Sequence, residues 1–255
     1  MSKTVVIGAS SGLGRCIGVG LAQRGDQVAL LARRRERIEA AAKEAGPETV
    51  AIECDVTNET SVRSAIGDAA DALGGIDNLI YTPAIGPLVR LVDTDADTWR
   101  RVFETNVTGA ALATAAAVPH LTASSGKAVY LSSDAGSLTP PWPGLGAYGV
   151  SKAALVSLVD AWRGEHPGIG FTCLVVGECP GGEGDGQTGM SVGWDSELAM
   201  KAYPIWVEKG YMPGKLMPIE DLINVVHTIL RTDPATSTPI VIARGAPASV
   251  VAPLT

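Results

Sequence analysis

Short runs of β-branched and aliphatic residues alternate with helical patterns along most of this chain, and this alternation restricts the fold more than any other feature. The strand patterns cover residues 4–8, 27–31, 49–54, 78–82, 128–132, 170–176 and 239–243. The helical patterns cover residues 13–24, 34–45, 61–73, 97–121 (one helix or two), 148–164 and 218–230. Strands joined through helices form right-handed crossovers, which make the strands parallel and cover both faces of the sheet. We therefore expect an α/β fold, a single doubly wound domain over residues 1–255 with a mostly parallel, seven-stranded sheet.

The composition limits what the protein can bind and where it can work. Hydrophobic residues make up 46% and charged residues 18% of the 255 residues, without the uninterrupted apolar run of about 20 residues that a membrane span needs. A net charge of -7 and a pI near 5.0 offer no basic surface for nucleic acid or anionic lipid. A strand pattern starts almost at Met1 and leaves no room for a secretory leader, which predicts a cytoplasmic protein. The cysteines lack paired metal-ligand spacing, which predicts a reducing compartment and no metal site: Cys16, Cys54, Cys173 and Cys179.

A glycine-rich turn joins the first strand pattern to the first helical pattern, with the spacing Gly-x-x-x-Gly-x-Gly. In doubly wound folds this turn holds the pyrophosphate of a dinucleotide, because glycines allow close backbone approach and the helix N-terminus offers unpaired N–H donors. An ordinary strand-to-helix turn also uses glycine, but the order of strand, glycines and helix favours the nucleotide. The predicted cofactor contacts in this turn are Gly8, Ser10, Ser11, Gly12, Leu13 and Gly14.

Tyr148 and Lys152 stand four residues apart at the start of a helical pattern. This spacing places the phenol and the ammonium group on one helix face. A free tyrosine has a pKa of about 10, so it shuttles protons poorly at neutral pH unless a nearby positive charge favours the phenolate. Such a pair also arises by chance, so its meaning depends on the other motifs.

Together, the glycine turn and the Tyr-x-x-x-Lys pair resemble the short-chain dehydrogenase/reductase family, well over residues 3–177 and loosely over 177–245. The resemblance implies a Rossmann-like fold and a small-molecule oxidoreductase that moves hydride between a nicotinamide and a carbonyl or alcohol carbon. It also implies a homodimer or homotetramer that pairs helices 106–121 and 148–164 between subunits. Small residues in the first of these helices would equally suit packing on the sheet.

The resemblance also assigns roles to the catalytic residues. Tyr148 would pass its proton to the substrate oxygen, while Lys152 would lower the pKa of the phenol and contact the nicotinamide ribose. Ser133 would hydrogen-bond the substrate oxygen, with Ser132 as the second choice. Asn106 would kink its helix and support a water-mediated proton relay beside the lysine. As isolated residues, Ser133 and Asn106 would more often be turn or capping residues.

The residues after the second strand pattern predict which dinucleotide is bound. An acidic residue there would bind the ribose 2′-hydroxyl of NAD and repel the 2′-phosphate of NADP, but the strand ends in Leu-Leu-Ala-Arg. Arg33 offers a planar fork of donors and a fixed positive charge suited to phosphate. NADP(H) is therefore the expected cofactor, with Ser10 and Arg34 as helpers of Arg33. Arg35 and Arg37 fit the solvated face of a helix.

The turns after the third, fourth and sixth strand patterns carry further possible cofactor contacts. By resemblance, Asp55 and Val56 would contact the adenine, although Asp55 could instead cap a turn or the following helix. The family's Asn-Asn-Ala-Gly after the fourth strand is replaced here by 81–84, Tyr-Thr-Pro-Ala, which puts the ribose contacts of that turn in doubt. The family's Pro-Gly after the sixth strand corresponds to 176–177 or to 180–181, so nicotinamide contacts there stay unassigned.

A glycine-rich break over residues 177–189 opens a segment that we expect to form a substrate lid over 177–217. Aromatic residues in and near it would suit an apolar or ring-containing substrate: Trp142, Trp194, Tyr203, Trp206 and Tyr211. The alternative is that these aromatics form a subunit interface or a local core.

Other functions are open at this stage. Alcohol oxidation, enoyl reduction and epimerisation use the same kind of site, and a non-catalytic sensor or scaffold would bind NADP(H) without turnover. A serine hydrolase is disfavoured because none of the three scattered histidines is placed as a base for Ser133.

Overall fold

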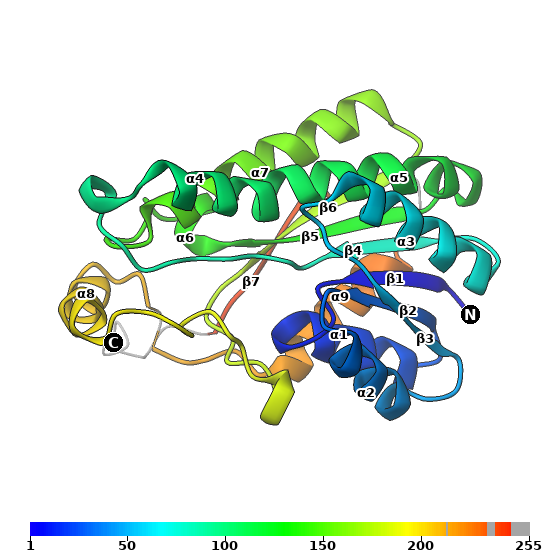
Figure 1. Cartoon of the computed structure of the whole chain (residues 1–255), viewed down its shortest axis with the longest axis horizontal. Coiled ribbons are helices and arrows are strands. Elements are labelled where there is room, and N and C mark those ends of the chain that lie inside the picture. Colours follow the sequence, from blue (N-terminus) through cyan, green and yellow to red (C-terminus); the bar gives the residue numbers. More distant parts are fainter. Residues whose placement is uncertain (213, 234–237, 246–255) are drawn as a thin grey trace, which may run out of the picture.

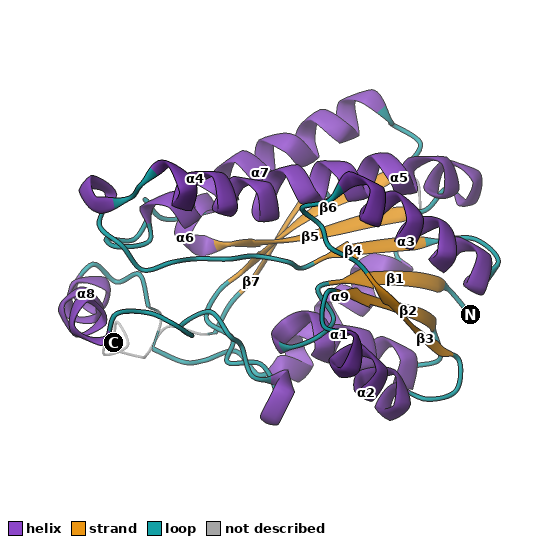
Figure 2. Ribbon diagram, viewed as in Figure 1, coloured by secondary structure: helices purple, strands orange, loops and turns teal. Residues whose placement is uncertain are grey.

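The computed structural model describes residues 1–212, 214–233 and 238–245, and these residues form a three-layered α/β structure (Figure 1, Figure 2). The strands pair in parallel throughout, in the order β3-β2-β1-β4-β5-β6-β7. Their bounds are β1 (Lys3–Ile7), β2 (Gln27–Ala32), β3 (Thr49–Glu53), β4 (Asn78–Tyr81), β5 (Lys127–Ser133), β6 (Gly170–Val176) and β7 (Ile240–Ala243). The predicted α/β fold with a seven-stranded parallel sheet is confirmed.

Helices cover both faces of the sheet, each face with its own hydrophobic core. One face packs against α3 (Glu59–Leu73), α5 (Gly109–Ser124) and α7 (Gly146–Glu165). The other face packs against α1 (Gly12–Gln23), α2 (Arg35–Ala45) and α9 (Ile219–Arg231). The central strands are buried on both faces, which is why they read as continuous apolar runs instead of alternating patterns.

Side-chain caps fix where several helices begin. Asn58 accepts a hydrogen bond from the backbone N–H of Ser61 at 3.0 Å and starts α3. Asp95 accepts one from the N–H of Thr98 at 2.7 Å and starts α4 (Ala96–Phe103). Each cap satisfies an N–H that has no partner inside its helix.

The strand order creates a crevice at one edge of the sheet. From β1 the chain builds outward to β2 and β3, then returns to the other side of β1 with β4. The loops that follow β1 and β4 therefore diverge at the carboxyl ends of the strands, which is where doubly wound folds bind their ligands. The glycine turn and the segment from Thr82 lie at this point.

Three elements depart from the expected pattern. A π-helix (Glu104–Thr108) separates α4 from α5, and a short helix α6 (Asp134–Ser137) follows β5. Helix α8 (Ser196–Glu208) lies within residues 177–217, where no helical pattern was expected. The remaining elements are the 3₁₀ turns η1 (Leu91–Asp93) and η3 (Gly184–Gly186). Residue 213 of the predicted lid and residues 246–255 of the predicted domain lie outside the described residues. Among the helices of the described ranges, none is long and apolar enough to cross a membrane.

Candidate active site

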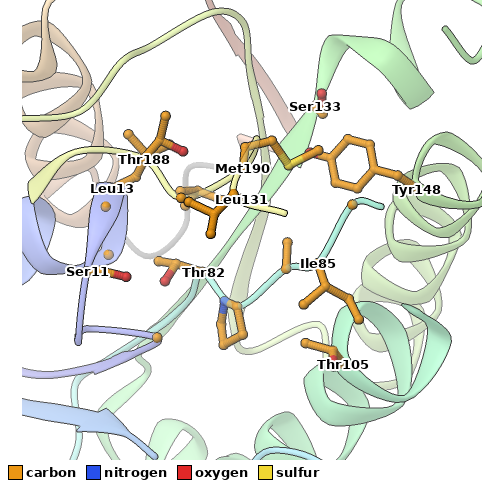
Figure 3. Close-up of a pocket in the computed structure, with 18 of the residues that line it drawn as sticks. Ser11, Leu13, Thr82, Ile85, Thr105, Leu131, Ser133, Tyr148, Thr188 and Met190 are labelled. Carbon is orange, nitrogen blue, oxygen red and sulfur yellow. The ribbon is translucent and has the colours of Figure 1, made fainter. Parts of the chain in front are cut away.

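A cavity of about 1200 Å³ opens at the carboxyl ends of the strands, lined by the glycine turn, the loop after β4, the end of β5, α7 and the segment after β6. Figure 3 shows Ser11 and Leu13 at one end, Ser133 and Tyr148 at the other, and Met190 between them. The two sets of residues that the sequence singled out thus border one cavity. We refer to them as its nucleotide end and its reaction end.

Three positions of the glycine turn at the nucleotide end require glycine, through backbone conformation or close contact. Gly8 and Gly12 adopt φ values of +88° and +59°, which favour glycine. A Cβ on Gly14 would lie 2.3 Å from Thr82 Oγ1 and 2.6 Å from the carbonyl oxygen of Gly8. Thr82 fills this space and donates to the carbonyl of Ile7 at 2.7 Å. The threonine therefore ties β4 to β1 where the family usually has asparagine.

Arginines converge on the glycine turn, although not as expected. Arg34, proposed only as a helper, donates to Ser10 Oγ at 2.8 Å and to Ser11 Oγ at 2.7 Å. Burial lowers the pKa of Arg34, and the positive charges of Arg37 and Arg33 lower it further. Arg33 lines the same end of the cavity, and so does Arg37, which lies 3.4 Å from Asp185 instead of on a purely solvated face. Guanidinium groups that crowd together in this way form a ready anion site.

Asp55 adopts the turn role that the sequence left open. Its Oδ1 accepts hydrogen bonds from the backbone N–H of Thr57 at 3.0 Å and from Thr57 Oγ1 at 2.8 Å. Val56 lines the cavity beside it. Contact of either residue with an adenine stays a prediction.

Tyr148 and Ser133 meet at the reaction end. The phenol is almost fully buried, and burial raises the pKa of Tyr148 to about 12, against a lowering contribution from its hydrogen bond with Ser133. Ser133 is also the N-cap of α6, since its Oγ accepts from the N–H of Ala135 at 3.2 Å. A phenol with this pKa stays protonated at neutral pH and has a proton to give.

The expected lowering of the phenol pKa by Lys152 is not found. The lysine Nζ lies 5.7 Å from the centroid of the Tyr148 ring and donates to the carbonyl of Leu131 at 2.6 Å. Burial lowers the pKa of Lys152 to about 8, so its ammonium group is itself destabilised. Desolvation of the phenol thus outweighs the charge of its neighbour in this arrangement.

Asn106 acts on the loop after β4. Its Oδ1 accepts from the N–H of Ile85 at 2.8 Å, and its Nδ2 donates to the carbonyl of Ile85 at 3.0 Å and to Ser151 Oγ at 2.9 Å. The residue is fully buried inside the π-helix, which confirms the expected irregularity at this position. These three bonds hold the loop against α7, while the proton relay stays a prediction.

The segment after β6 closes over the reaction end. Met190 and Tyr148 both pack against Gly86. A Cβ built on Gly86 would lie 2.2 Å from Met190 Cε and 3.0 Å from Tyr148 Cδ2. Trp194 donates from Nε1 to the carbonyl of Gly86 at 2.8 Å, and Trp206 does so to that of Pro143 at 2.9 Å. Trp142, Trp194 and Trp206 line the cavity and also belong to a small core, which includes Tyr211; the exposed Tyr203 lines the cavity only. The expected local core is present, while the substrate lid stays a prediction.

Two acidic residues at the reaction end were missed from sequence. Asp134 follows Ser133 directly, and Glu178 follows β6; both line the cavity. Neither belongs to a recognisable motif. Only the position of Asp134 beside Ser133 could have drawn attention to it.

The family model of short chain dehydrogenases matches residues 2–190 of the chain. The chain belongs to the short-chain dehydrogenase family. It is 34% identical over 232 residues to a glycine betaine reductase of Emericella nidulans, which covers 89% of this chain and 17% of that protein. It is 35% identical over 172 residues to 11-beta-hydroxysteroid dehydrogenase 1A of Arabidopsis thaliana, covering 65% of this chain and 49% of that one. The chain thus spans about half or less of these relatives.

A solved alcohol dehydrogenase of Thermococcus sibiricus, complexed with 5-hydroxy-NADP, shares the fold of this short-chain dehydrogenase. The two superpose with a TM-score of 0.79 at 22% identity, over 96% of each chain. The nucleotide end fits a dinucleotide, because its glycines leave the backbone open and Ser11 makes no capping bond to α1. The first N–H groups of that helix are therefore available to a phosphate.

Proposed function

We propose that this short-chain dehydrogenase interconverts a carbonyl and an alcohol with NADP(H), as a reductase of small aldehydes or ketones that have an apolar or ring-containing part. The observation that carries the proposal is the meeting of Ser133, Tyr148 and Lys152 at the end of a cavity whose other end is a dinucleotide cradle. The names of two relatives, a reductase and a dehydrogenase, support the same class of reaction.

The protein would hold and protonate the substrate oxygen. The bound dinucleotide supplies the hydride to the carbonyl carbon. Ser133 and Tyr148, which line the same end of the cavity, would both point at the oxygen on which negative charge develops. Tyr148 then gives up its proton as the general acid, a contribution of about a hundredfold to ten-thousandfold in rate. In alcohol oxidation the same residues act in reverse.

Lys152 would contact the ribose and stabilise the phenolate that Tyr148 leaves behind. Its ammonium group is buried beside the tyrosine ring and held by the Leu131 carbonyl. A positive charge there favours the product state of the proton transfer. Asn106 would act indirectly, by holding the loop from Ile85 and by supporting a water relay.

Preference for NADP(H) is supported by the arginines at the nucleotide end. Arg34 is oriented by Ser10 and Ser11, and Arg33 and Arg37 line the same end of the cavity. The residue that follows β2 is Arg33 instead of a carboxylate that would repel a 2′-phosphate. We therefore assign phosphate recognition to Arg34 and Arg33 together. The dinucleotide in the solved relative also carries that phosphate.

The experiment follows NADPH and NADH oxidation with a panel of aldehydes and ketones. We expect turnover with a strong preference for NADPH, and we expect Arg33→Met and Arg34→Met each to lower that preference by about tenfold to a hundredfold. Glu39→Gln, on the exposed part of α2, is the matched control. Equal use of both dinucleotides by the unaltered protein would refute the assignment.

The proposal also covers the assembly and the cellular location of the protein. We expect a cytoplasmic homodimer or homotetramer with one catalytic domain, and light scattering measures the oligomer. Enoyl reduction and epimerisation are separated from carbonyl reduction by the substrate panel. The substitution of the family's Asn-Asn-Ala-Gly turn favours a sensor or scaffold as the second candidate, and tight NADPH binding without turnover across the panel would select it.

A further inference from the structure

Asp134 is a buried carboxylate with an unused oxygen beside the reacting groups. Asp134 is only 3% exposed and is one of the residues that line the cavity. Oδ1 accepts a hydrogen bond from Ser133 Oγ at 3.3 Å, whereas Oδ2 is buried without any hydrogen-bond partner among the described residues. Buried charges are normally paired, so an orphaned carboxylate oxygen in a residue that borders a cavity indicates a missing partner.

Glu178 brings a second carboxyl group to the same place. Its backbone carbonyl is used by the N–H of Met217 at 2.8 Å, but its half-buried side chain forms no hydrogen bond or ion pair within the described part of the chain. Burial raises the pKa of Glu178, and the charge of Asp134 raises it further. The register of β5 and β6 places Ser133 beside Val176, so Asp134 and Glu178 follow the ends of neighbouring strands and border the same cavity.

Within the described ranges, no cation forms an ion pair with either carboxylate. Burial raises the pKa of Asp134, and the charge of the exposed Arg244 opposes that rise without an ion pair within 4.0 Å. The ammonium group of Lys152 is directed to the Leu131 carbonyl. Arg101, another cation that lines the cavity, extends from α4 and contacts Thr98.

An uncompensated negative charge is costly at this position. The charge of Asp134 already raises the pKa of Tyr148, and carbonyl reduction adds further negative charge on an oxygen held by Ser133 and Tyr148. Like charges in a low-dielectric site oppose that step. A positive charge on the substrate would reverse the sign of the interaction in both the bound and the transition state.

The aromatic wall provides the second half of a cation site. The cavity is lined by Trp142, Trp194 and Trp206. The ring centroid of Trp206 lies 5.3 Å from that of Trp142 and 6.0 Å from that of Trp194. Their indole N–H groups are bound to Thr139 Oγ1 and to backbone carbonyls. Trp142 and Trp206 are buried, so the π surface that a ligand can reach belongs mainly to the half-buried Trp194. Electron-rich rings together with carboxylates attract alkylammonium groups, which are both apolar in bulk and positively charged.

We propose that the substrate carries a cationic amine or quaternary ammonium group within a few bonds of its carbonyl or alcohol carbon, held between Asp134, Glu178 and the aromatic wall. The short separation follows because Asp134 is the sequence neighbour and hydrogen-bond partner of Ser133. This inference rests on the proposed function and specifies its substrate class.

The test compares two ligands of the same shape and different charge. Choline and 3,3-dimethylbutan-1-ol are isosteric alcohols, one with a quaternary nitrogen and one with a carbon at the same place. Calorimetric titration of the NADPH-bound protein should show tighter binding of choline by about tenfold or more. Asp134→Asn and Glu178→Gln should each reduce that ratio by about tenfold, while Glu183→Gln, an exposed residue on the same segment, should leave it unchanged.

Several outcomes would overturn the proposal: equal affinity for the two alcohols, a preference that survives both variants, or displacement of choline by millimolar Mg²⁺, which would make this a metal site. Glu178→Gln provides the test if Asp134→Asn does not fold. A parallel assay follows NADPH oxidation with the matching aldehydes. If choline is preferred and neither aldehyde is reduced, the cation site stands and the proposed oxidoreductase function fails.

Discussion

Lys152→Met changes the pH dependence of stability by an amount that can be worked out from the structure. Burial lowers the pKa of Lys152 from 10.5 to about 8 in the folded protein. The unfolded chain therefore binds this proton more tightly than the folded chain, and the resulting cost to stability is fully present below pH 8. It disappears as the pH rises through the window from 8 to 10.5.

The size of the effect follows from this difference in pKa. One pKa unit corresponds to about 1.4 kcal/mol, so the buried charge costs about 3 kcal/mol at pH 7 and about 1 kcal/mol at pH 10. Methionine removes this cost at every pH. The lost hydrogen bond to Leu131 and the changed packing shift the stability of the variant by an amount that does not depend on pH.

Urea unfolding of the unaltered protein and of Lys152→Met, each at pH 7 and at pH 10, gives the free energy of unfolding of the variant relative to the unaltered protein at both pH values. We expect the stability of Lys152→Met relative to the unaltered protein to fall by about 2 kcal/mol between pH 7 and pH 10. Lys43→Met, on the exposed face of α2, is the control and should show no such change. A relative stability that is independent of pH, or that rises, would refute the account of Lys152 as a desolvated cation.

Two further predictions concern the loops that position the site. Asn106→Ala should destabilise the protein by about 2 to 4 kcal/mol in urea unfolding. The substitution removes three hydrogen bonds of a buried side chain and leaves both backbone groups of Ile85 without their partner. A cost below about 1 kcal/mol would contradict the role of Asn106 in holding the loop after β4. Thr82→Val should cost only about 1 kcal/mol, because the carbonyl of Ile7 still accepts from the Thr82 N–H at 3.1 Å, and a larger loss would mean that the hydroxyl has another role.

The strands and the glycine turn could be predicted from sequence because local and tertiary requirements agree there. Strands buried on both faces must be apolar along their whole length, so β1, β4 and β5 are visible as short aliphatic runs. Gly8 and Gly14 are required by backbone conformation and by contact with Thr82. The spacing of these glycines in the sequence is therefore enough to predict the turn.

Other features depend on contacts that sequence patterns do not encode. In α8, the internal Pro204 obscures the helix in the sequence. Its clearest local signal is the cap at Asp195, which accepts a hydrogen bond from the Leu198 N–H at 2.7 Å. The direction of Arg34 is set by its bonds to the glycine turn, so sequence favoured its neighbour Arg33. Asp134 and Glu178 border the same cavity because β5 and β6 pair in parallel and end together.

Tyr148→Phe is the substitution that tests the proposed proton donor most directly. Phenylalanine keeps the ring against Met190 and removes only the hydroxyl group. We expect kcat/KM for carbonyl reduction to fall at least about a hundredfold, while the Kd for NADPH, measured by fluorescence titration, changes by less than about threefold. Near-normal reductase activity in this variant would contradict the assignment of Tyr148 as the general acid.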